Sequence, residues 1–296
     1  MEIVIASGKG GTGKTFLSSN LIHYMNKYVE LVIGADADVE APDLALALGG
    51  VERIMYSENL YESRKAVIDH NKCLGPRCSK CLSICRFHAL KVVGSSIEVI
   101  EENCEGCGAC SIVCPVNAIS FKVTLTGRLY ICHVRTNSTI VTGDLEVGQR
   151  NTGHLVYRVK ELAHKYAEEV NAKHIIVDAA AGIGCPVISS LAGADVLIIV
   201  SEPTPQSFQG AQRLLEMSRG MRLRTYLVIN RYDLNEEFAL KMARELDIEL
   251  LGLIPNDFSV VKSYAAMKPI IEYQPRSRAS QSLRRLLETI TTSVMR

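Results

Sequence analysis

A glycine-rich segment near the N-terminus of this 296-residue chain has the residue types and the spacing needed to bind phosphate. The segment is Ser7-Gly8-Lys9-Gly10-Gly11-Thr12-Gly13-Lys14-Thr15, and from Gly8 onward it fits G-x-x-x-x-G-K-S/T. The glycines allow backbone N–H groups to point inward and surround phosphate oxygens. Lys14 reaches the β- and γ-phosphates, and the Thr15 hydroxyl holds Mg²⁺. The segment is therefore predicted to bind a nucleoside triphosphate with Mg²⁺.

The same glycines also satisfy a dinucleotide-binding pattern, G-x-G-x-x-G, which begins at Gly8. Asp36 follows at about the separation where an acid binds the ribose of a dinucleotide. Lys14 and Thr15 favour the triphosphate site, because a dinucleotide pyrophosphate needs neither a lysine nor a metal-binding hydroxyl there.

Eight of the ten cysteines lie between Cys73 and Cys114. In a reducing compartment such a cluster is typical of a metal site rather than of disulfides. The second half, Cys104-x₂-Cys107-x₂-Cys110-x₃-Cys114-Pro115, has the spacing of the bacterial ferredoxin run. The first half is Cys73-x₄-Cys78-x₂-Cys81-x₃-Cys85, and similar segments follow the fourth cysteine of each half. This internal repeat predicts a ferredoxin with two [4Fe–4S] clusters.

In such ferredoxins the fourth cysteine of each run binds the neighbouring cluster. The first cluster is therefore assigned to Cys73, Cys78, Cys81 and Cys114, and the second to Cys104, Cys107, Cys110 and Cys85. Two other interpretations remain. The first run also fits a plant-type [2Fe–2S] site with Cys110 as a distant ligand, which would leave the other cysteines of the block unused. Zinc prefers two separated Cys-x₂-Cys pairs, which the tight runs do not match.

The remainder of the chain predicts the scaffold that positions these residues. An apolar strand precedes the glycine-rich segment, a helix follows it, and residues 29–34 are a second strand leading to Asp36-Ala37-Asp38. Further strands are predicted at Arg128–Val134, Thr139–Thr142, His174–Asp178, Val196–Val200, Leu223–Ile229 and Leu250–Leu253. Helices separate the later strands, beginning with Leu155–Val170, for which Asn151 or Thr152 is the expected cap. This alternation predicts an α/β fold with a mostly parallel sheet and helices on both faces. With the glycine-rich segment, the predicted fold is that of a P-loop NTPase.

The cysteine block has shorter elements than the remainder of the chain. It is predicted to be an inserted domain of residues 57–125 with the small α+β fold of bacterial ferredoxins. The parent α/β domain, which contains the predicted nucleotide site, then consists of residues 1–56 and 126–296. Cys132 and Cys185 lie outside the block and are expected to be small buried residues.

The overall composition excludes several classes of protein. The chain is 47% hydrophobic and 22% charged, which excludes disorder and predicts a large buried core. Its net charge is +1, so no nucleic-acid partner is expected. The first residues lack a secretory signal, and Asp178, Pro186 and Asp195 interrupt the most apolar stretch, so no membrane span is expected. We expect a cytoplasmic protein.

The segment from Lys9 to Thr15 resembles the deviant Walker A motif of the MinD/ParA/Mrp/nitrogenase-iron-protein class of ATPases. The resemblance covers residues 1–56 and 126–296, and it is strongest to a branch that carries an inserted ferredoxin domain. It implies an ATP-dependent homodimer, or a heterodimer with a similar ATPase. In that dimer Lys9 reaches the ATP of the partner subunit.

The resemblance also implies roles for three aspartates. Asp36-Ala37-Asp38 matches switch I, where Asp38 orients the attacking water and Asp36 supports the Mg²⁺ shell. Asp178 stands where the acid of the Walker B motif and switch II belongs. The implied catalytic residues are therefore Lys9, Lys14 and Asp38.

Gly182, Asn230 and Pro255 complete the implied nucleotide site. Gly182 offers a backbone N–H to the γ-phosphate, and Asn230 and Pro255 lie in segments that resemble the adenine-binding loops. Switch II of the family usually contains Asp-x-Pro-Pro-Gly, whereas alanines stand at both proline positions here. A looser loop is expected, and with it slow hydrolysis of ATP.

The C-terminal helix is amphipathic, with Leu283, Leu286, Leu287, Ile290 and Val294 on one face. MinD proteins end in a helix that binds membranes. The polar face here is weakly charged, so we expect this helix to pack on the sheet instead.

Together these features predict an ATPase that gates electron transfer from ferredoxin-type clusters to an unknown redox partner protein. One alternative is an iron–sulfur carrier resembling Mrp, although such carriers use a Cys-x-x-Cys pair in the ATPase domain, which this sequence lacks outside the insertion. A second alternative is a positioning ATPase in which the ferredoxin serves only as a docking module.

Overall fold

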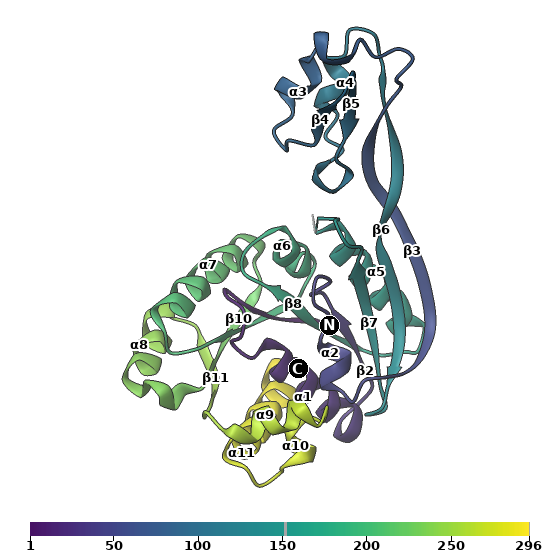
Figure 1. The fold of residues 1–296 in the computed structure, drawn as a ribbon. Coiled ribbons are helices and arrows are strands. Elements are labelled where there is room, and N and C mark those ends of the chain that lie inside the picture. The colour runs from purple at the N-terminus through teal and green to yellow at the C-terminus, as the bar shows by residue number, and fades with distance from the viewer. Residues whose placement is uncertain (151–152, 296) are drawn as a thin grey trace. The chain divides into compact units, whose positions relative to one another are not determined.

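Residues 1–150 and 153–295 are described by the computed structural model of the chain (Figure 1). They form two units. The larger unit comprises Met1–Glu58, Leu129–Asp144 and Asn151–Arg296, and the smaller unit comprises Asn59–Arg128 and Leu145–Arg150. The predicted cap at Asn151 or Thr152 lies outside the described residues.

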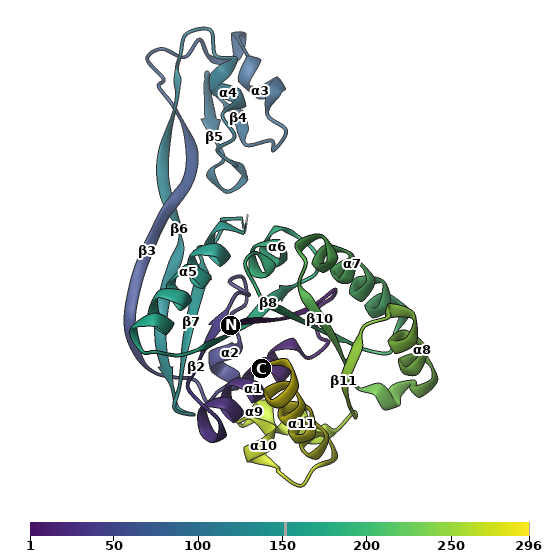
Figure 2. The same ribbon diagram turned by 180° about the vertical axis from the view of Figure 1, so that it is seen from behind.

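A nine-stranded sheet forms the centre of the larger unit, with the order β11-β10-β9-β1-β8-β2-β7-β6-β3 (Figure 2). The strands are β1 (Glu2–Ser7), β2 (Val32–Asp36), β3 (Val51–Ile68), β6 (Ile119–Val134), β7 (Ser138–Leu145), β8 (His174–Ala181), β9 (Val196–Ser201), β10 (Arg224–Asn230) and β11 (Glu249–Ile254). Neighbouring strands from β11 to β7 all pair in parallel. This confirms the prediction of a mostly parallel sheet.

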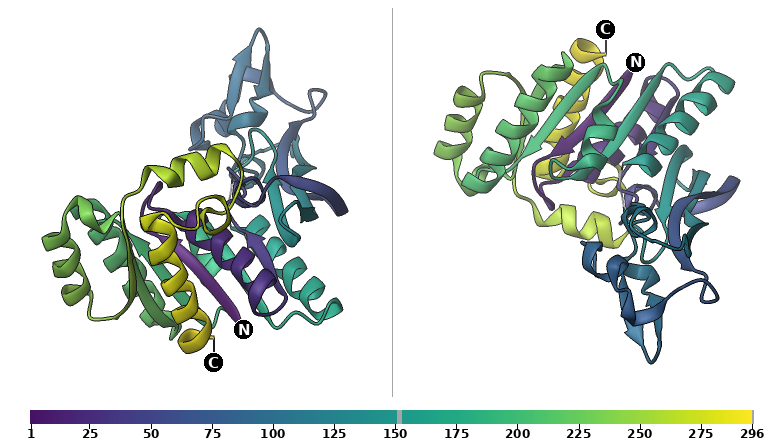
Figure 3. Two further views of the ribbon diagram at one scale, coloured as in Figure 1. Left: turned by 90° about the horizontal axis from the view of Figure 1, so that it is seen from below. Right: turned by 90° about the horizontal axis from the view of Figure 1, so that it is seen from above.

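Helices cover both faces of this sheet, as the two views of Figure 3 show. The helices of the larger unit are α1 (Lys14–Tyr28), α2 (Leu44–Ala47), α5 (His154–Glu169), α6 (Cys185–Leu191), α7 (Pro205–Met221), α8 (Glu236–Leu246), α9 (Phe258–Ala265), α10 (Ile270–Tyr273) and α11 (Arg278–Thr289). In the C-terminal helix, Leu283, Leu286 and Leu287 are buried in the same core as β1 and α1. This face therefore packs inside the unit. Within the described residues, no helix is both long and apolar enough to cross a membrane.

The structure extends several predicted strands, among them β6, which begins at Ile119 rather than at Arg128, and it makes two further corrections. The second strand begins at Val32 rather than at residue 29, because Val29 and Glu30 still donate backbone hydrogen bonds to Met25 at the end of α1. The chain from Val51 to Ile68 forms an 18-residue strand, β3, where short elements were expected. Most side chains of β3 are exposed, so its sequence lacks the alternation of apolar and polar residues that identifies a half-buried strand.

The smaller unit contains the eight clustered cysteines. Its elements are α3 (Lys80–Ile84), β4 (Leu90–Val93), β5 (Ser96–Val99) and α4 (Ala109–Ile112), together with short 3₁₀ turns at Gly75–Arg77 and Glu101–Asn103 and the outer parts of β3 and β6. Strands β4 and β5 pair antiparallel. Its core is small, formed by apolar residues such as Ala66, Ile97 and Ile119 with several of the cysteines.

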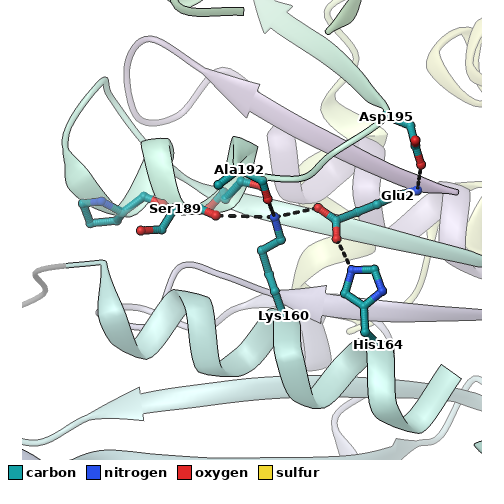
Figure 4. A network of polar contacts seen from close by, with 8 residues as sticks. Glu2, Lys160, His164, Ser189, Ala192 and Asp195 are labelled. Carbon is teal, nitrogen blue, oxygen red and sulfur yellow. Dashed lines mark hydrogen bonds and ion pairs between the residues drawn. The ribbon is translucent and has the colours of Figure 1, made fainter. Parts of the chain in front are cut away.

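A buried ion pair connects β1, α5 and the end of α6 (Figure 4). Lys160 Nζ lies 2.7 Å from Glu2 Oε1, and both side chains are less than a tenth exposed. The same ammonium donates to the carbonyl oxygens of Ser190 and Ala192, which α6 leaves without helical partners. Glu2 Oε2 also contacts His164 Nε2 at 2.6 Å. The charge of Lys160 is thus compensated by one carboxylate and the carbonyls of a helix end.

We expect Lys160→Met to lower the free energy of unfolding by about 3–5 kcal/mol, because Glu2 would remain buried without its ammonium partner. The matched control is Lys165→Met on the exposed side of the same helix, which should change it by less than about 0.5 kcal/mol. Denaturant unfolding measures both. Adding Glu2→Gln to Lys160→Met should recover part of the loss, and equal stability of the two single variants would contradict this account.

Candidate functional site

The glycine-rich loop connects β1 to α1 and fits closely against two other segments. A Cβ atom on Gly8 would collide with the backbone of Gly210 in α7. Gly13 has a φ of +101°, and a side chain there would collide with Nδ2 of Asn230, which donates to the Thr12 carbonyl at 2.8 Å. Only glycine fits at these two positions. The loop is thereby held at the N-terminus of α1, where a helix favours anions.

Two of the predicted metal-site acids lie side by side in the sheet. Asp36 and Asp178 are register partners in the neighbouring strands β2 and β8, and both are about 1% exposed. Asp178 accepts hydrogen bonds from the hydroxyls of Thr15, at 2.6 Å, and Ser18, at 2.9 Å. The predicted pair Thr15 and Asp178 is thus in direct contact. Ser18, which the sequence analysis did not identify, lies one turn further along α1.

Burial raises the pKa of each acid in this site. Desolvation raises the pKa of Asp178 to about 6, although Lys14 and the two hydroxyls act in the opposite direction. Desolvation, and then the neighbouring Asp178, raise the pKa of Asp36 above its usual range. Burial also raises the pKa of Asp38, while Lys14 lowers it. A bound Mg²⁺ ion would stabilise the ionised forms of these buried carboxylates, because Mg²⁺ prefers oxygen ligands that carry negative charge.

A cavity of about 350 Å³ opens beside the loop. The predicted site residues that line it are Gly10, Gly11, Gly13, Lys14, Thr15, Asp38, Asn230 and Pro255. It is also lined by Val260, Val261 and Tyr264 of α9, which the sequence analysis did not identify because no motif marks them. The other predicted residues do not line it in the described part of the chain: Gly8, Lys9, Thr12, Asp36, Asp178 and Gly182.

Two predicted site residues, Gly182 and Lys9, contact groups of their own chain rather than the phosphates that we expected them to bind. The backbone N–H of Gly182 donates to the Ser7 carbonyl at 2.9 Å, so in this conformation it is not directed to a phosphate. Lys9 Nζ lies 3.1 Å from Glu202 Oε2 of its own chain. Arg231 holds the other oxygen of Glu202, whose side chain is only 8% exposed. Glu202 directly follows strand β9, and nothing in its local sequence marked it.

The eight clustered cysteines line two separate cavities of the smaller unit. One is lined by Cys73, Cys78, Cys81 and Cys114, and the other by Cys85, Cys104, Cys107 and Cys110. Each set combines three cysteines of one run with the fourth cysteine of the other. Cys132 is buried in β6, whereas Cys185 is exposed, contrary to its expected burial.

Backbone N–H groups donate to four of the cysteine sulfurs. Sulfur atoms accept from the N–H of Gly75, Ala89, Ala118 and Ala66, at 3.2–3.4 Å. The last of these bonds goes to Cys104, and the buried Lys65 donates to the Cys104 carbonyl at 2.9 Å. Burial raises the pKa of the Cys81 and Cys110 thiols, and hydrogen bonds to sulfur stabilise a thiolate that is bound to metal. This arrangement suits metal-bound sulfur.

Comparison with known proteins identifies several proteins to which the chain is similar. A family model of the CobQ/CobB/MinD/ParA nucleotide binding domain matches residues 3–270. An uncharacterized protein of Methanocaldococcus jannaschii is 31% identical over 274 residues, 92% of each chain. The septum site-determining protein MinD of Pyrococcus horikoshii, solved with Mg-ADP, has a TM-score of 0.61 at 18% identity and covers 99% of this chain and 96% of its own. A ferredoxin of Methanothermococcus thermolithotrophicus is 38% identical over 56 residues, 19% of this chain and 93% of its own.

The raised pKa of Asp178 predicts a pH dependence of stability. Between about pH 4 and pH 6 the folded chain holds a proton on Asp178 that the unfolded chain releases, so this group's contribution to stability falls as pH rises. Asp178→Asn removes the buried charge, and the hydroxyls of Thr15 and Ser18 can rotate to bond the amide. At pH 7 and without nucleotide, we expect this variant to be more stable than wild type by on the order of 2 kcal/mol.

Denaturant unfolding between about pH 4 and pH 8 measures this effect. The exposed Asp144→Asn is the matched control and should follow the wild type. Parallel pH profiles for wild type and Asp178→Asn would show that Asp178 is not the group responsible.

Proposed function

The chain belongs to the CobQ/CobB/MinD/ParA nucleotide-binding family, and from this we propose that it is an ATP-driven iron–sulfur protein. Members of this family are ATPases. In the proposal, Mg-ATP binding closes a dimer, and closure controls one-electron transfer through two [4Fe–4S] clusters to a redox partner. The observation that carries the proposal is that one chain has both the nucleotide cavity and two cavities of four cysteines each.

We assign the triphosphate to the loop from Gly8 to Thr15. Lys14, buried at the start of α1, would bind the β- and γ-phosphates. Thr15 would hold Mg²⁺ directly, with Asp178 and Asp36 supporting its water shell. The hydrogen bond between Thr15 and Asp178 supports these two roles. It orients the hydroxyl oxygen that would bind Mg²⁺ and keeps the carboxylate close to the water shell of the ion.

We assign the adenine to the end of the same cavity lined by Asn230, Pro255 and α9. The side chains of Val260, Val261 and Tyr264 offer an apolar surface for the base. Asn230 already bonds the loop backbone at Thr12, so it would connect the base site to the phosphate site rather than serve the base alone.

Lys9 and Asp38 are the proposed residues of dimerisation and hydrolysis. Lys9 would leave Glu202 of its own chain and bind the partner subunit's ATP, in the way that an arginine finger acts in trans. Asp38 would orient the attacking water. Because Gly182 is bonded to Ser7, and alanines replace both prolines of switch II, we expect slow hydrolysis.

We assign the clusters as the cysteine spacing predicts, with Cys73, Cys78, Cys81 and Cys114 for one and Cys85, Cys104, Cys107 and Cys110 for the other. The two cysteine-lined cavities and the N–H donors to sulfur support this assignment. When bound, such clusters transfer single electrons. Within the described residues, no three His, Cys, Asp or Glu side chains are placed to hold one metal ion. A cubane differs from a single ion, since each thiolate binds its own iron.

The protein kept anaerobic should contain about eight iron and eight sulfide per chain, because each cubane takes four of each. Cys107→Ser should remove one cluster's signal from low-temperature EPR spectra while ATP binding remains. Cys185→Ser, at an exposed cysteine outside both cavities, is the matched control and should retain both signals. Stoichiometric zinc, or two irons per chain, would reject the cluster assignment.

A non-hydrolysable Mg-ATP analogue should dimerise the wild-type chain, and Lys9→Ala should prevent this by removing the cation supplied in trans. Glu202→Gln should dimerise at lower analogue concentration, because Lys9 would no longer be held by a carboxylate of its own chain. Light scattering measures the mass, and potentiometric EPR measures the cluster potentials in the same samples. If reduction of a cluster changes the affinity for the analogue tenfold, binding of the analogue shifts the cluster potential by about 59 mV. We expect this shift in the wild type and not in Lys9→Ala.

The two readouts separate the alternatives. Dimerisation without a change of potential would leave the ferredoxin unit as a docking module. Transfer of iron and sulfide to an apo-protein on adding ATP would instead indicate a carrier. A chain that stays monomeric in wild type and in Glu202→Gln falsifies the nucleotide-driven dimer.

A further inference from the structure

A second cavity, of about 510 Å³, lies in the larger unit. It is formed by the C-terminal half of α1, the turn between β6 and β7, and the segment between α9 and α10. None of the residues that line it lines the nucleotide cavity. Helix α1 begins at the nucleotide loop and carries His23 and Lys27 about two to four turns further along its axis. The two cavities are therefore separate sites.

The walls of this cavity are predominantly basic. Lys27, Arg135 and Lys268 contribute three cations, and Glu272 contributes the one carboxylate. Lys27 binds that carboxylate at 2.9 Å, and Arg135 donates to the Gly49 carbonyl through only one of its nitrogens. Arg135 and Lys268 are both exposed residues. The net charge of the lining favours an anion.

His23 supplies a second and independent observation. Its side chain is only 4% exposed and lines the cavity, yet neither ring nitrogen has a hydrogen-bond partner among the described residues. Nε2 lies 3.5 Å from Glu272 Oε2, which is beyond a good hydrogen bond. Desolvation lowers the pKa of His23, so the ring is neutral and offers one donor and one acceptor. A buried polar group without a partner is costly, and a ligand that bonds it would recover that cost.

We propose that this cavity is a binding site for a small organic anion that carries phosphate or carboxylate groups. Arg135 and Lys268 bind the oxyanion, and His23 bonds a polar group at the inner end. The volume is within the range of small-molecule sites and exceeds that of the nucleotide cavity. Glu272 is neutralised by Lys27, so it does not oppose the ligand's charge.

The test uses the full-length chain with a non-hydrolysable Mg-ATP analogue at saturation, so that the glycine-rich loop does not take the probes. Phosphate, pyrophosphate and citrate are titrated separately, and the histidine ring resonances are followed by NMR. The chain has seven histidines, and His23→Asn identifies the resonance of interest. We expect a saturable shift of the His23 signal at millimolar probe or below. A response to the two phosphates or to citrate distinguishes the phosphate class from the carboxylate class.

Variants at the exposed cations test the geometry. Arg135→Gln and Lys268→Gln should each weaken the affinity about tenfold, the usual effect of losing a charge-assisted hydrogen bond. Lys165→Gln, an exposed lysine on α5, is the matched control and should bind as wild type does. No His23 response to any of the three probes would overturn the proposal, as would wild-type affinity in both cation variants.

Discussion

Two buried carboxylates in neighbouring strands impose the constraint on which the nucleotide site depends. Asp36 and Asp178 are register partners in β2 and β8, so their separation is set by strand pairing rather than by loops. Buried charges are retained only where hydrogen bonds or cations compensate them. Here the hydroxyls of Thr15 and Ser18 bond Asp178, and the backbone N–H groups of Asp38 and Leu44 bond Asp36. These bonds tie the first turn of α1 and the segment from Asp38 to Leu44 to the same pair of strands.

The backbone of the glycine-rich loop is fixed beside this acidic pair, whereas the Lys9 side chain of the loop could exchange one charged partner for another. Gly8 against Gly210 and Gly13 against Asn230 hold the backbone, because neither contact leaves space for a Cβ atom. The Lys9 side chain forms an ion pair with Glu202, and more than a quarter of this side chain is exposed. Breaking that pair leaves Arg231 to neutralise Glu202. In the proposed dimer, a fixed backbone and a lysine that can change its partner would let the second subunit complete the site.

The sequence identified the parts of this arrangement that local pattern determines. The glycine spacing, the cysteine spacing and the apolar strands each follow from residues close together in the chain. Glu202 and the three side chains of α9 could not be identified, because their partners are distant in sequence and no motif contains them. Strand β3 was missed for a different reason: a strand exposed on most of its length has no apolar face to mark it. The partner of Gly182 was missed because the same N–H can bond either a phosphate or the Ser7 carbonyl.

The two units draw their stability from different sources. The larger unit buries a continuous apolar core between the sheet and its helices, which suffices for a domain of this size. The smaller unit has only seven buried residues in its core cluster, and two of those, Cys81 and Cys104, are among the proposed ligands. A core of that size cannot offset the conformational entropy of some seventy residues without another contribution. Cluster binding would supply it, since metal-binding free energy in small domains is folding free energy. The cysteines would then decide not only what the smaller unit does but whether it folds.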